Sequence, residues 1–156
     1  MYKRQVILPK ADVVLCVNAI LTDSLKKRNA FFHNLYSCLK KNGHLNLVVP
    51  SLESWLLTRI IQKKWKIDND LFKEKLSGKE AIIRYQHIQQ GNAEIDTVPT
   101  KHYLKEELML LLTNEGFIVV GCEKIEYTWK TEFSKPPGWL KDPHPWDWLI
   151  ICRKNK

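Results

Sequence analysis

Apolar residues form short continuous runs and helical stripes along the first third of the chain. Residues 12–17, DVVLCV, are an almost continuous apolar run, as expected for a parallel strand that is buried on both faces. A turn over residues 18–23 follows, in which Thr22 or Asp23 is placed to cap a helix. The helix itself is predicted by an apolar stripe at helical spacing, with lysines and an arginine between its members: Leu25, Phe32, Leu35, Tyr36 and Leu39.

The end of this helix leads into a second buried strand. Asn42-Gly43 predicts a left-handed helix stop, and residues 45–49 form an apolar run that Pro50 ends. A strand, a helix and a second strand in this order predict a right-handed crossover, and therefore a parallel sheet in an α/β fold.

The middle of the chain has a helical pattern with basic residues on one side. An apolar stripe predicts a helix that the acidic stretch 68–70 breaks, with a short amphipathic segment at 71–76 after it: Leu56, Leu57, Ile60, Ile61 and Trp65. We interpret this region as a helical insertion over one end of the sheet. Residues 81–88 alternate weakly and predict a short strand or an extended loop.

The last third contains a helix and two strands. A leucine stripe after Tyr103 predicts a helix that ends at residues 114–116, and residues 117–127 form a strand. A proline-rich loop then leads to a last strand over residues 146–153. Three tryptophans of this region should supply buried apolar area: Trp139, Trp146 and Trp148.

Composition limits the possible classes of protein. A chain of 156 residues with 44% hydrophobic content can form one compact unit. Its apolar runs are short and no signal pattern opens it, so we expect a cytoplasmic protein that does not enter the membrane. The four cysteines are widely spaced and are expected to be reduced, without a metal. The net charge of +8 is spread over every expected helix, which is a weak signal for nucleic acid.

Ligand-binding residues are expected where parallel strands end. Ser51 and Glu53 follow the carboxyl end of the second strand, where open α/β sheets bind ligands, and are our candidates for substrate contacts. Ser51 could equally cap the helix that follows. His87 and His102 could each act as a general base, but neither has a neighbouring carboxylate or serine in the sequence, so loop histidines are expected.

The first five residues, MYKRQ, have no relation to the strand that follows. Residues 2–5 can be encoded by TAT-AAG-AGA-CAG, which resembles the end of a transposon adaptor used to prepare sequencing libraries. We therefore expect residues 1–5 to be a non-native leader, with an ordinary basic terminus as the alternative.

The order of these elements resembles the carboxyl-terminal half of class I S-adenosylmethionine-dependent methyltransferases, which have a Rossmann-like fold. The resemblance lies in ADVVLCVNAIL, LKKNGHLNLVVPS, HYLKEELMLLLTNEGFIVVGCEKI and WDWLIICRK, which match the family's fourth to seventh strands and late helix. It implies residues 6–156 of a single methyltransferase domain, with the sheet order four, five, seven, six and an antiparallel last strand. It also implies S-adenosylmethionine as cofactor, contacted at Val17, Asn18 and Ala19.

The family's glycine-rich cofactor turn has no counterpart, because the six glycines never form Gly-x-Gly. We therefore expect a truncated chain, inactive by itself, from a parent that transfers a methyl group to an unknown acceptor. Its first strand would have an open edge over residues 12–17, through which copies could self-associate. Two alternatives remain open: a non-catalytic half-domain that pairs with a partner chain, and a basic RNA-binding module.

Overall fold

The computed structural model describes residues 9–86 and 100–155, which divide into two compact units. Unit 1 comprises residues up to 51, 100–125 and from 147 onward, and unit 2 comprises residues 52–99 and 126–146. The strands are β1 (Ala11–Val17), β2 (Leu39–Pro50), β3 (Phe117–Glu126) and β4 (Trp146–Lys154). The helices are α1 (Leu25–Cys38), α2 (Leu52–Phe72), α3 (Gly78–Gln86), α4 (Lys105–Glu115) and the short 3-10 helix η1 (Trp129–Thr131).

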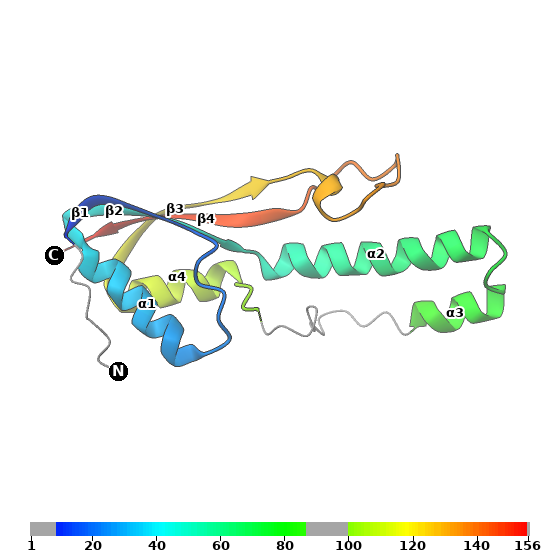
Figure 1. The fold of residues 1–156 in the computed structure, drawn as a ribbon, viewed down its shortest axis with the longest axis horizontal. Coiled ribbons are helices and arrows are strands. Elements are labelled where there is room, and N and C mark those ends of the chain that lie inside the picture. The colour runs from blue at the N-terminus through cyan, green and yellow to red at the C-terminus, as the bar shows by residue number, and fades with distance from the viewer. Residues whose placement is uncertain (1–8, 87–99, 156) are drawn as a thin grey trace, which may run out of the picture. The chain divides into compact units, whose positions relative to one another are not determined.

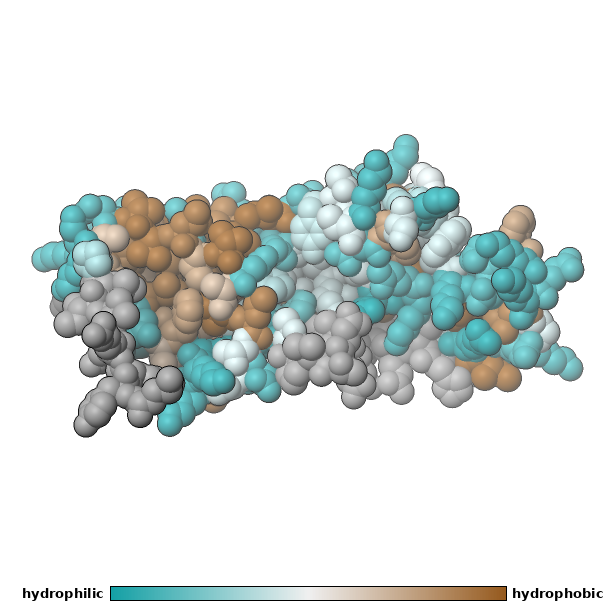
Figure 2. Space-filling view, in the orientation of Figure 1, coloured by the Kyte–Doolittle hydropathy of each residue, from teal (hydrophilic) through white to brown (hydrophobic). Residues whose placement is uncertain are grey.

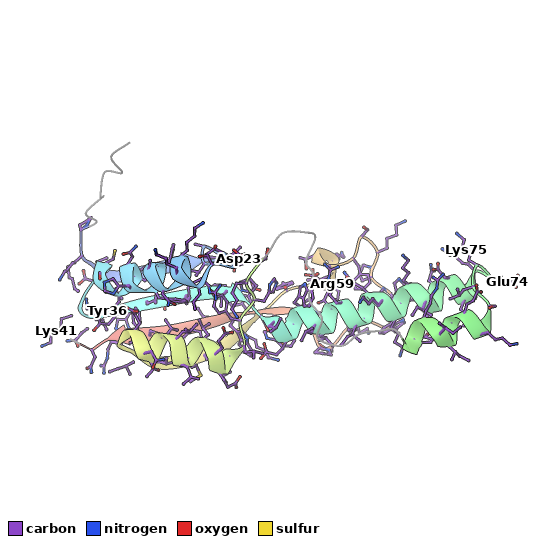
Figure 3. The ribbon with its side chains drawn as sticks, turned by 90° about the horizontal axis from the view of Figure 1, so that it is seen from below. Asp23, Tyr36, Lys41, Arg59, Glu74 and Lys75 are labelled. Atoms are coloured by element: carbon purple, nitrogen blue, oxygen red, sulfur yellow. The ribbon has the colours of Figure 1, made fainter. Side chains whose placement is uncertain are left out.

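Unit 1 is built on one mixed sheet with the strand order β1-β2-β4-β3 (Figure 1). β1 runs parallel to β2, whereas β4 runs antiparallel to β2, with Leu47 opposite Ile150. This order and the antiparallel β4 confirm the arrangement that the family resemblance implied. The prediction that β1 is buried on both faces was wrong, because Val13, Leu15 and Val17 are 57%, 69% and 54% exposed. Helices α1 and α4 lie side by side on one face of the sheet (Figures 1 and 3), so the sheet has one helix-covered face and one face that α1 and α4 leave open.

The core of unit 1 lies between the sheet and these two helices. Most of its fully buried side chains come from β2, β4 and α4, and the loop residues Ile20 and Tyr103 are fully buried as well. The side chain of Tyr36 in α1 lies on the side of α4 (Figure 3), and its ring contacts that of Phe117 edge to face, with 5.0 Å between the ring centres. The ammonium of Lys154 is buried here and donates to the carbonyl oxygens of Tyr36 and Leu39, both at 2.9 Å. A cation at the carboxyl end of α1 is favourable, because helix carbonyls there lack partners within the helix.

Two details of the α1 region differ from the prediction. Ser24, not Thr22 or Asp23, is the N-cap of α1, and its hydroxyl accepts from the Lys27 N–H. The helix ends at Cys38, before Asn42-Gly43, and β2 begins at Leu39. Asn42 does adopt a left-handed conformation, with φ 61°, but it lies in an irregularity of β2. A Cβ on Gly43 of β2 would meet the Asp12 carbonyl of β1 at 3.1 Å, so the close approach of the two strands requires a glycine at position 43.

Unit 2 contains α2 and α3, and two predictions there were wrong. The acidic stretch 68–70 does not break the helix, because α2 continues to Phe72, and residues 78–86 form α3 rather than a strand. The reason is tertiary: Ile67 of α2 packs against Leu76 and Ala81 in a small buried cluster. The start of α3 is a capping box, in which the Ser77 hydroxyl accepts from the Glu80 N–H and the Glu80 carboxylate accepts from the Ser77 N–H.

The proline-rich segment of unit 2 contacts α2. Ser54 accepts a hydrogen bond from the Trp146 N–H at 2.7 Å, and both residues are buried. Trp146 and Trp148 are buried as predicted, but Trp139 is 62% exposed, so the prediction of burial was wrong for Trp139. Its ring still contacts Trp65 edge to face at 6.4 Å.

The remaining expectations concern the first five residues, His87, the cysteines and the membrane. Residues 1–5, the expected leader, and His87 lie outside the described residues. All four cysteines are free thiols, and burial raises the pKa of Cys16 and that of Cys152, the latter to about 12. Among the described residues, no helix has the length and apolar character needed to span a membrane.

Candidate functional site

The candidate site lies in unit 1, where the parallel strands β1 and β2 end. Asn18 directly follows β1 and adopts a left-handed conformation, with φ 46°. Its N–H donates to the Val48 carbonyl at 2.9 Å, and its side-chain Nδ2 donates to Asp147 Oδ2 at 3.3 Å. Asparagine tolerates this backbone conformation better than most residues, which lets β1 end abruptly with a polar side chain at its carboxyl end.

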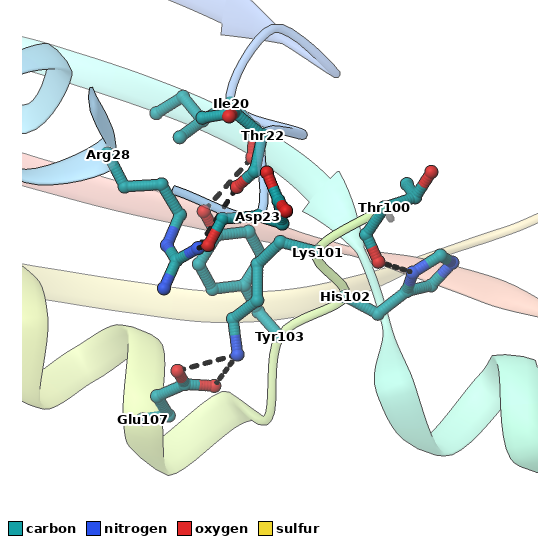
Figure 4. Close-up of polar contacts among 9 residues, drawn as sticks. All are labelled: Ile20, Thr22, Asp23, Arg28, Thr100, Lys101, His102, Tyr103 and Glu107. Carbon is teal, nitrogen blue, oxygen red and sulfur yellow. Dashed lines mark hydrogen bonds and ion pairs between the residues drawn. The ribbon is translucent and has the colours of Figure 1, made fainter. Parts of the chain in front are cut away.

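Two loops lie beside these strand ends and are bonded to each other (Figure 4). The first, residues 18–24, connects β1 to α1, and the second, residues 100–104, precedes α4. Thr22 and Thr100 form an antiparallel bridge, and the Lys101 N–H donates to the Leu21 carbonyl at 3.0 Å. These bonds fix the path of both loops beside the strand ends.

Tyr103 joins both loops to β2. Its side chain is fully buried, its hydroxyl donates to the Ile20 carbonyl at 3.0 Å, and its N–H donates to the Pro50 carbonyl at 3.0 Å. Burial raises the pKa of Tyr103 to about 12, so the hydroxyl is a stable donor at neutral pH. Tyr103 is thus a structural hydrogen-bond donor, and it holds the first loop against the sheet.

Charged residues reinforce the loops on the helix side (Figure 4). Arg28 of α1 donates through Nη1 to the carbonyl oxygens of Thr22 and Asp23, at 3.0 and 2.6 Å. Lys101 forms an ion pair with Glu107 at 2.6 Å, and its ammonium lies 5.0 Å from the centre of the Tyr103 ring. The loop backbone is therefore held by side chains of both α1 and α4.

His102 has a defined tautomer in this site. Its Nδ1 lies 3.3 Å from the Thr100 carbonyl oxygen, which can only accept, so Nδ1 carries the proton and Nε2 carries a lone pair. Burial lowers the pKa of His102, and this effect outweighs the opposing contributions of the hydrogen bond to the Thr100 carbonyl and of the Asp147 carboxylate. The imidazole is therefore neutral at pH 7, with Nε2 able to accept a proton.

The residues predicted to contact a cofactor lie at the end of β1. Val17 is the last residue of β1, and Val17, Asn18 and Ala19 are all exposed. Ala19 also donates its N–H to the thiol of Cys16. These three residues are therefore exposed, although the N–H groups of Asn18 and Ala19 are already bonded within the chain, and their role as cofactor contacts stays a prediction.

The two predicted substrate residues differ in their surroundings. Ser51 is only 2% exposed and pairs with Tyr103 in a parallel bridge, directly before α2. This place fits the packing and capping alternative better than a direct substrate contact. Glu53 lies in the first turn of α2, in unit 2, where a carboxylate favours the helix N-terminus.

The pairing of Asp147 with Asn18 and its electrostatic effect on His102 were missed from the sequence. Asp147 lies at the start of β4 and is opposite Pro50 of β2. It is 129 residues from Asn18 in the chain, so no local pattern could relate them. The sequence did place Asp147 at the start of the last strand. Because this strand was expected to run antiparallel to its neighbours, its first residues lie where β1 and β2 end.

The chemistry of this site is that of polar recognition and proton transfer. Asp147 can accept hydrogen bonds from a hydroxyl or an amine, Asn18 can both donate and accept, and His102 offers a neutral imidazole. Within residues 9–86 and 100–155, no cluster of three histidine, cysteine or acidic side chains is placed to hold a metal ion.

Comparisons with known proteins find similarity in the fold only. No protein-family model matches the chain, and no curated protein matches it significantly. The fold resembles a SAM-dependent methyltransferase from Methanosarcina mazei, with a TM-score of 0.51 and 16% identity over 97% of this chain. It also resembles a candidate methyltransferase from Bacillus halodurans, with a TM-score of 0.50 and 12% identity over 99% of this chain.

A third similar structure was solved in work on the conversion of a disulfide bond into a thioacetal group during echinomycin biosynthesis. Its TM-score is 0.50, with 10% identity over 95% of this chain. The present chain spans 63%, 68% and 50% of the lengths of these three proteins, in the order given. The fold is therefore a mixed α/β, Rossmann-like arrangement of the methyltransferase kind, as the order of elements predicted.

Proposed function

We propose that this chain is part of a methyltransferase domain whose complete form transfers a methyl group from S-adenosylmethionine to an acceptor. The observation that carries the proposal is the pair Asn18 and Asp147 at the carboxyl ends of β1 and β2. In open α/β sheets this edge binds ligands. The Rossmann-like fold of the similar structures supports a nucleoside-containing cofactor at this edge.

The side chains present suit the acceptor side of such a reaction. Methyl transfer by direct displacement depends largely on aligning a nucleophile with the sulfonium methyl group. Asp147 and Asn18 could orient the hydroxyl or amine of an acceptor, and the His102 Nε2 could take up its proton. Val17, Asn18 and Ala19 would contact the cofactor, whereas Ser51, which is buried beside Tyr103, would support the end of β2 rather than contact the acceptor.

This chain lacks the glycine-rich part of a methyltransferase cofactor site. The chain has no Gly-x-Gly turn to approach the cofactor closely, and it spans 63% of the Methanosarcina mazei protein. We therefore infer that this chain contains only half of the binding crevice. It should bind the cofactor product S-adenosylhomocysteine weakly, with a dissociation constant on the order of 1 mM, rather than not at all.

The test is a titration of the full chain with S-adenosylhomocysteine, followed by amide chemical shifts in NMR spectra. We expect small, saturable shifts concentrated at Val17, Asn18 and Ala19. The variant Asn18→Ala should lose most of these shifts. The matched variant Asn34→Ala, which changes an exposed asparagine of α1, should keep them.

Two results would contradict the proposal. Shifts that are absent at the end of β1 up to about 10 mM ligand would remove the cofactor site from this edge. Submicromolar binding by the chain itself would instead show that the crevice is complete, and would refute the inference that only half of it is present.

A further inference from the structure

Trp139 of unit 2 is exposed although its loop is held in place. Of the six tryptophans, all of which lie in the described residues, only Trp139 is strongly exposed, at 62%. The Leu140 N–H donates to the Pro137 carbonyl at 2.9 Å, and Pro137 and Leu140 are both buried. The ring of Trp139 contacts that of Trp65 on α2, with 6.4 Å between the ring centres. A large aromatic ring that is fixed in contact with water is typical of a binding surface.

α2 carries another exposed aromatic residue on the face that holds Trp65. Trp65 and Phe72 are seven residues apart, so they lie on one face of the helix, about 10 Å apart along its axis. Phe72 is 87% exposed. Ile67 packs against Ala81 of α3, which lies along one side of α2 (Figure 1). Because Ile67 is roughly 140–160° around the helix from Trp65 and Phe72, their face points away from α3.

A row of basic residues runs beside these aromatic rings. Arg59, Lys66 and Lys73 follow one another at seven-residue spacing, over about 21 Å of helix. The Lys73 N–H donates to the Asn69 carbonyl at 3.1 Å, which continues the helical bonding just past the end of α2. Each of the two lysines is exposed and directly follows one of the aromatic residues of the face. A basic row and an aromatic row therefore run side by side along α2.

The acidic residues in the second half of α2 do not neutralise the basic row. Asp68 accepts a hydrogen bond from the Tyr85 hydroxyl, and the Asp70 carboxylate lies 3.8 Å from Arg84, so both are engaged by α3. In the parts of the chain that the structure describes, no acidic side chain forms an ion pair with either lysine of the row. The row therefore presents positive charge to the solvent.

The chemistry of this surface matches single-stranded nucleic acid. Every base has a flat ring that stacks on an aromatic side chain, and every phosphate attracts an ammonium or guanidinium group. A membrane surface would require the exposed apolar residues to share one side of unit 2. Ile82 and Ile83 are 60% and 52% exposed, but they belong to α3, which packs on the other side of α2. Figure 2 shows mostly hydrophilic side chains over α2 and α3.

We propose that this face of unit 2 binds single-stranded nucleic acid. Bases stack on the aromatic residues, and phosphates contact the basic residues. We call this surface the aromatic–basic face, and its six residues are Trp65, Phe72, Trp139, Arg59, Lys66 and Lys73. Binding here goes beyond the proposed methyl transfer and uses no residue at the end of β1, so its test does not depend on S-adenosylhomocysteine.

The test is a titration of a fluorescein-labelled oligouridylate of about 12 nucleotides with the full chain, followed by fluorescence anisotropy. We expect a dissociation constant on the order of 10 μM at about 50 mM salt. Three phosphate contacts should give a slope of about −2 for the logarithm of the binding constant against the logarithm of the salt concentration. A parallel titration with oligodeoxythymidylate of the same length shows whether RNA or DNA is the preferred source of the single strand.

Variants separate the stacking contribution from the charge contribution. Trp139→Ala should raise the dissociation constant by about tenfold and leave the salt slope unchanged, because one stacked base is lost. Trp139→Phe keeps an aromatic ring and should stay within about threefold of the wild type. The matched control Leu110→Ala changes a residue of α4 that is 64% exposed, and should shift the constant by less than about twofold.

The double variant Lys66→Gln, Lys73→Gln should reduce the salt slope to about −0.7, because two of three phosphate contacts are removed. Its matched control is Lys26→Gln, Lys27→Gln, which removes the same charge from exposed residues of α1 and should leave the slope unchanged.

Four results would overturn the proposal. They are no binding up to about 1 mM chain at low salt, a dissociation constant that Trp139→Ala leaves unchanged, and a salt slope that the double lysine variant leaves unchanged. The fourth is binding to phosphatidylserine vesicles without binding to either oligonucleotide, which would assign the surface to a membrane instead.

Discussion

The substitution Tyr103→Phe tests whether one buried hydroxyl holds the candidate site together. The Tyr103 hydroxyl donates to the Ile20 carbonyl at 3.0 Å, and Tyr103 and Ile20 are 0% and 1% exposed. Phenylalanine keeps the ring but leaves that carbonyl buried without this donor. An unsatisfied buried acceptor costs about 1–3 kcal/mol, so we expect the free energy of unfolding to fall by about 2 kcal/mol at pH 7.

The alkaline pH dependence gives the same substitution a second, independent readout. The pKa of Tyr103 is raised by burial from 10 to about 12 in the folded chain, so the folded state binds more protons than the unfolded state between these values. The stabilisation is therefore complete below pH 10 and is lost as the pH rises toward 12. Two units of pKa correspond to at most about 3 kcal/mol. The wild type should lose this stability over that window, whereas Tyr103→Phe should not.

Urea unfolding, followed by tryptophan fluorescence and circular dichroism at a series of pH values, measures both effects. Tyrosinate absorbance in the folded chain reports the titration of the hydroxyl directly. The expected result is a gap between wild type and variant that is constant below pH 10 and narrows above it. Equal stabilities at pH 7, or pH profiles that stay parallel up to pH 12, would refute the reasoning.

Two further predictions concern the end of α4 and the histidine of the site. Gly116→Ala should lower the free energy of unfolding by about 1–2 kcal/mol, since Gly116 has φ 103° and an added Cβ would meet the Tyr36 ring at 3.3 Å; Gly138→Ala, with no atom within 4 Å of its Cβ position, is the control in urea unfolding and should change it by less than about 0.5 kcal/mol. His102→Gln should abolish a loss of stability on acidification: the pKa of His102 is lowered in the folded chain, so the unfolded state binds more protons and stability falls as the pH drops below 6.5. Unfolding midpoints of both proteins between about pH 7 and 5 measure this, and an unchanged slope in the variant would contradict it.

Local patterns were sufficient for most elements of unit 1. The leucine stripe of α4 reflects burial on one face of the helix, which leaves a direct record in the spacing of apolar residues. The apolar run of β1 identified the strand but not its burial, because Val13, Leu15 and Val17 are exposed. Gly116 marks the end of α4 because its left-handed conformation favours glycine. The order of the strands followed from resemblance to the methyltransferase family, and the structure confirms it.

Local patterns failed where a contact from elsewhere in the chain reversed a weak preference. The acidic stretch 68–70 discourages a helix, yet α2 continues through it, because Ile67 is buried against residues of the turn and α3. Residues 81–88 alternate weakly as a strand would, but the capping box of Ser77 and Glu80 begins α3, which continues to Gln86.

The sequence by itself determined that β1 is an uncharged apolar strand ending in Asn18, since these properties belong to the residues themselves. Only the tertiary structure decided what lies beside it. Hydrogen bonds and electrostatic effects depend on distance in space, and Asp147, 129 residues further along the chain, comes to Asn18 only because β4 runs antiparallel to β2.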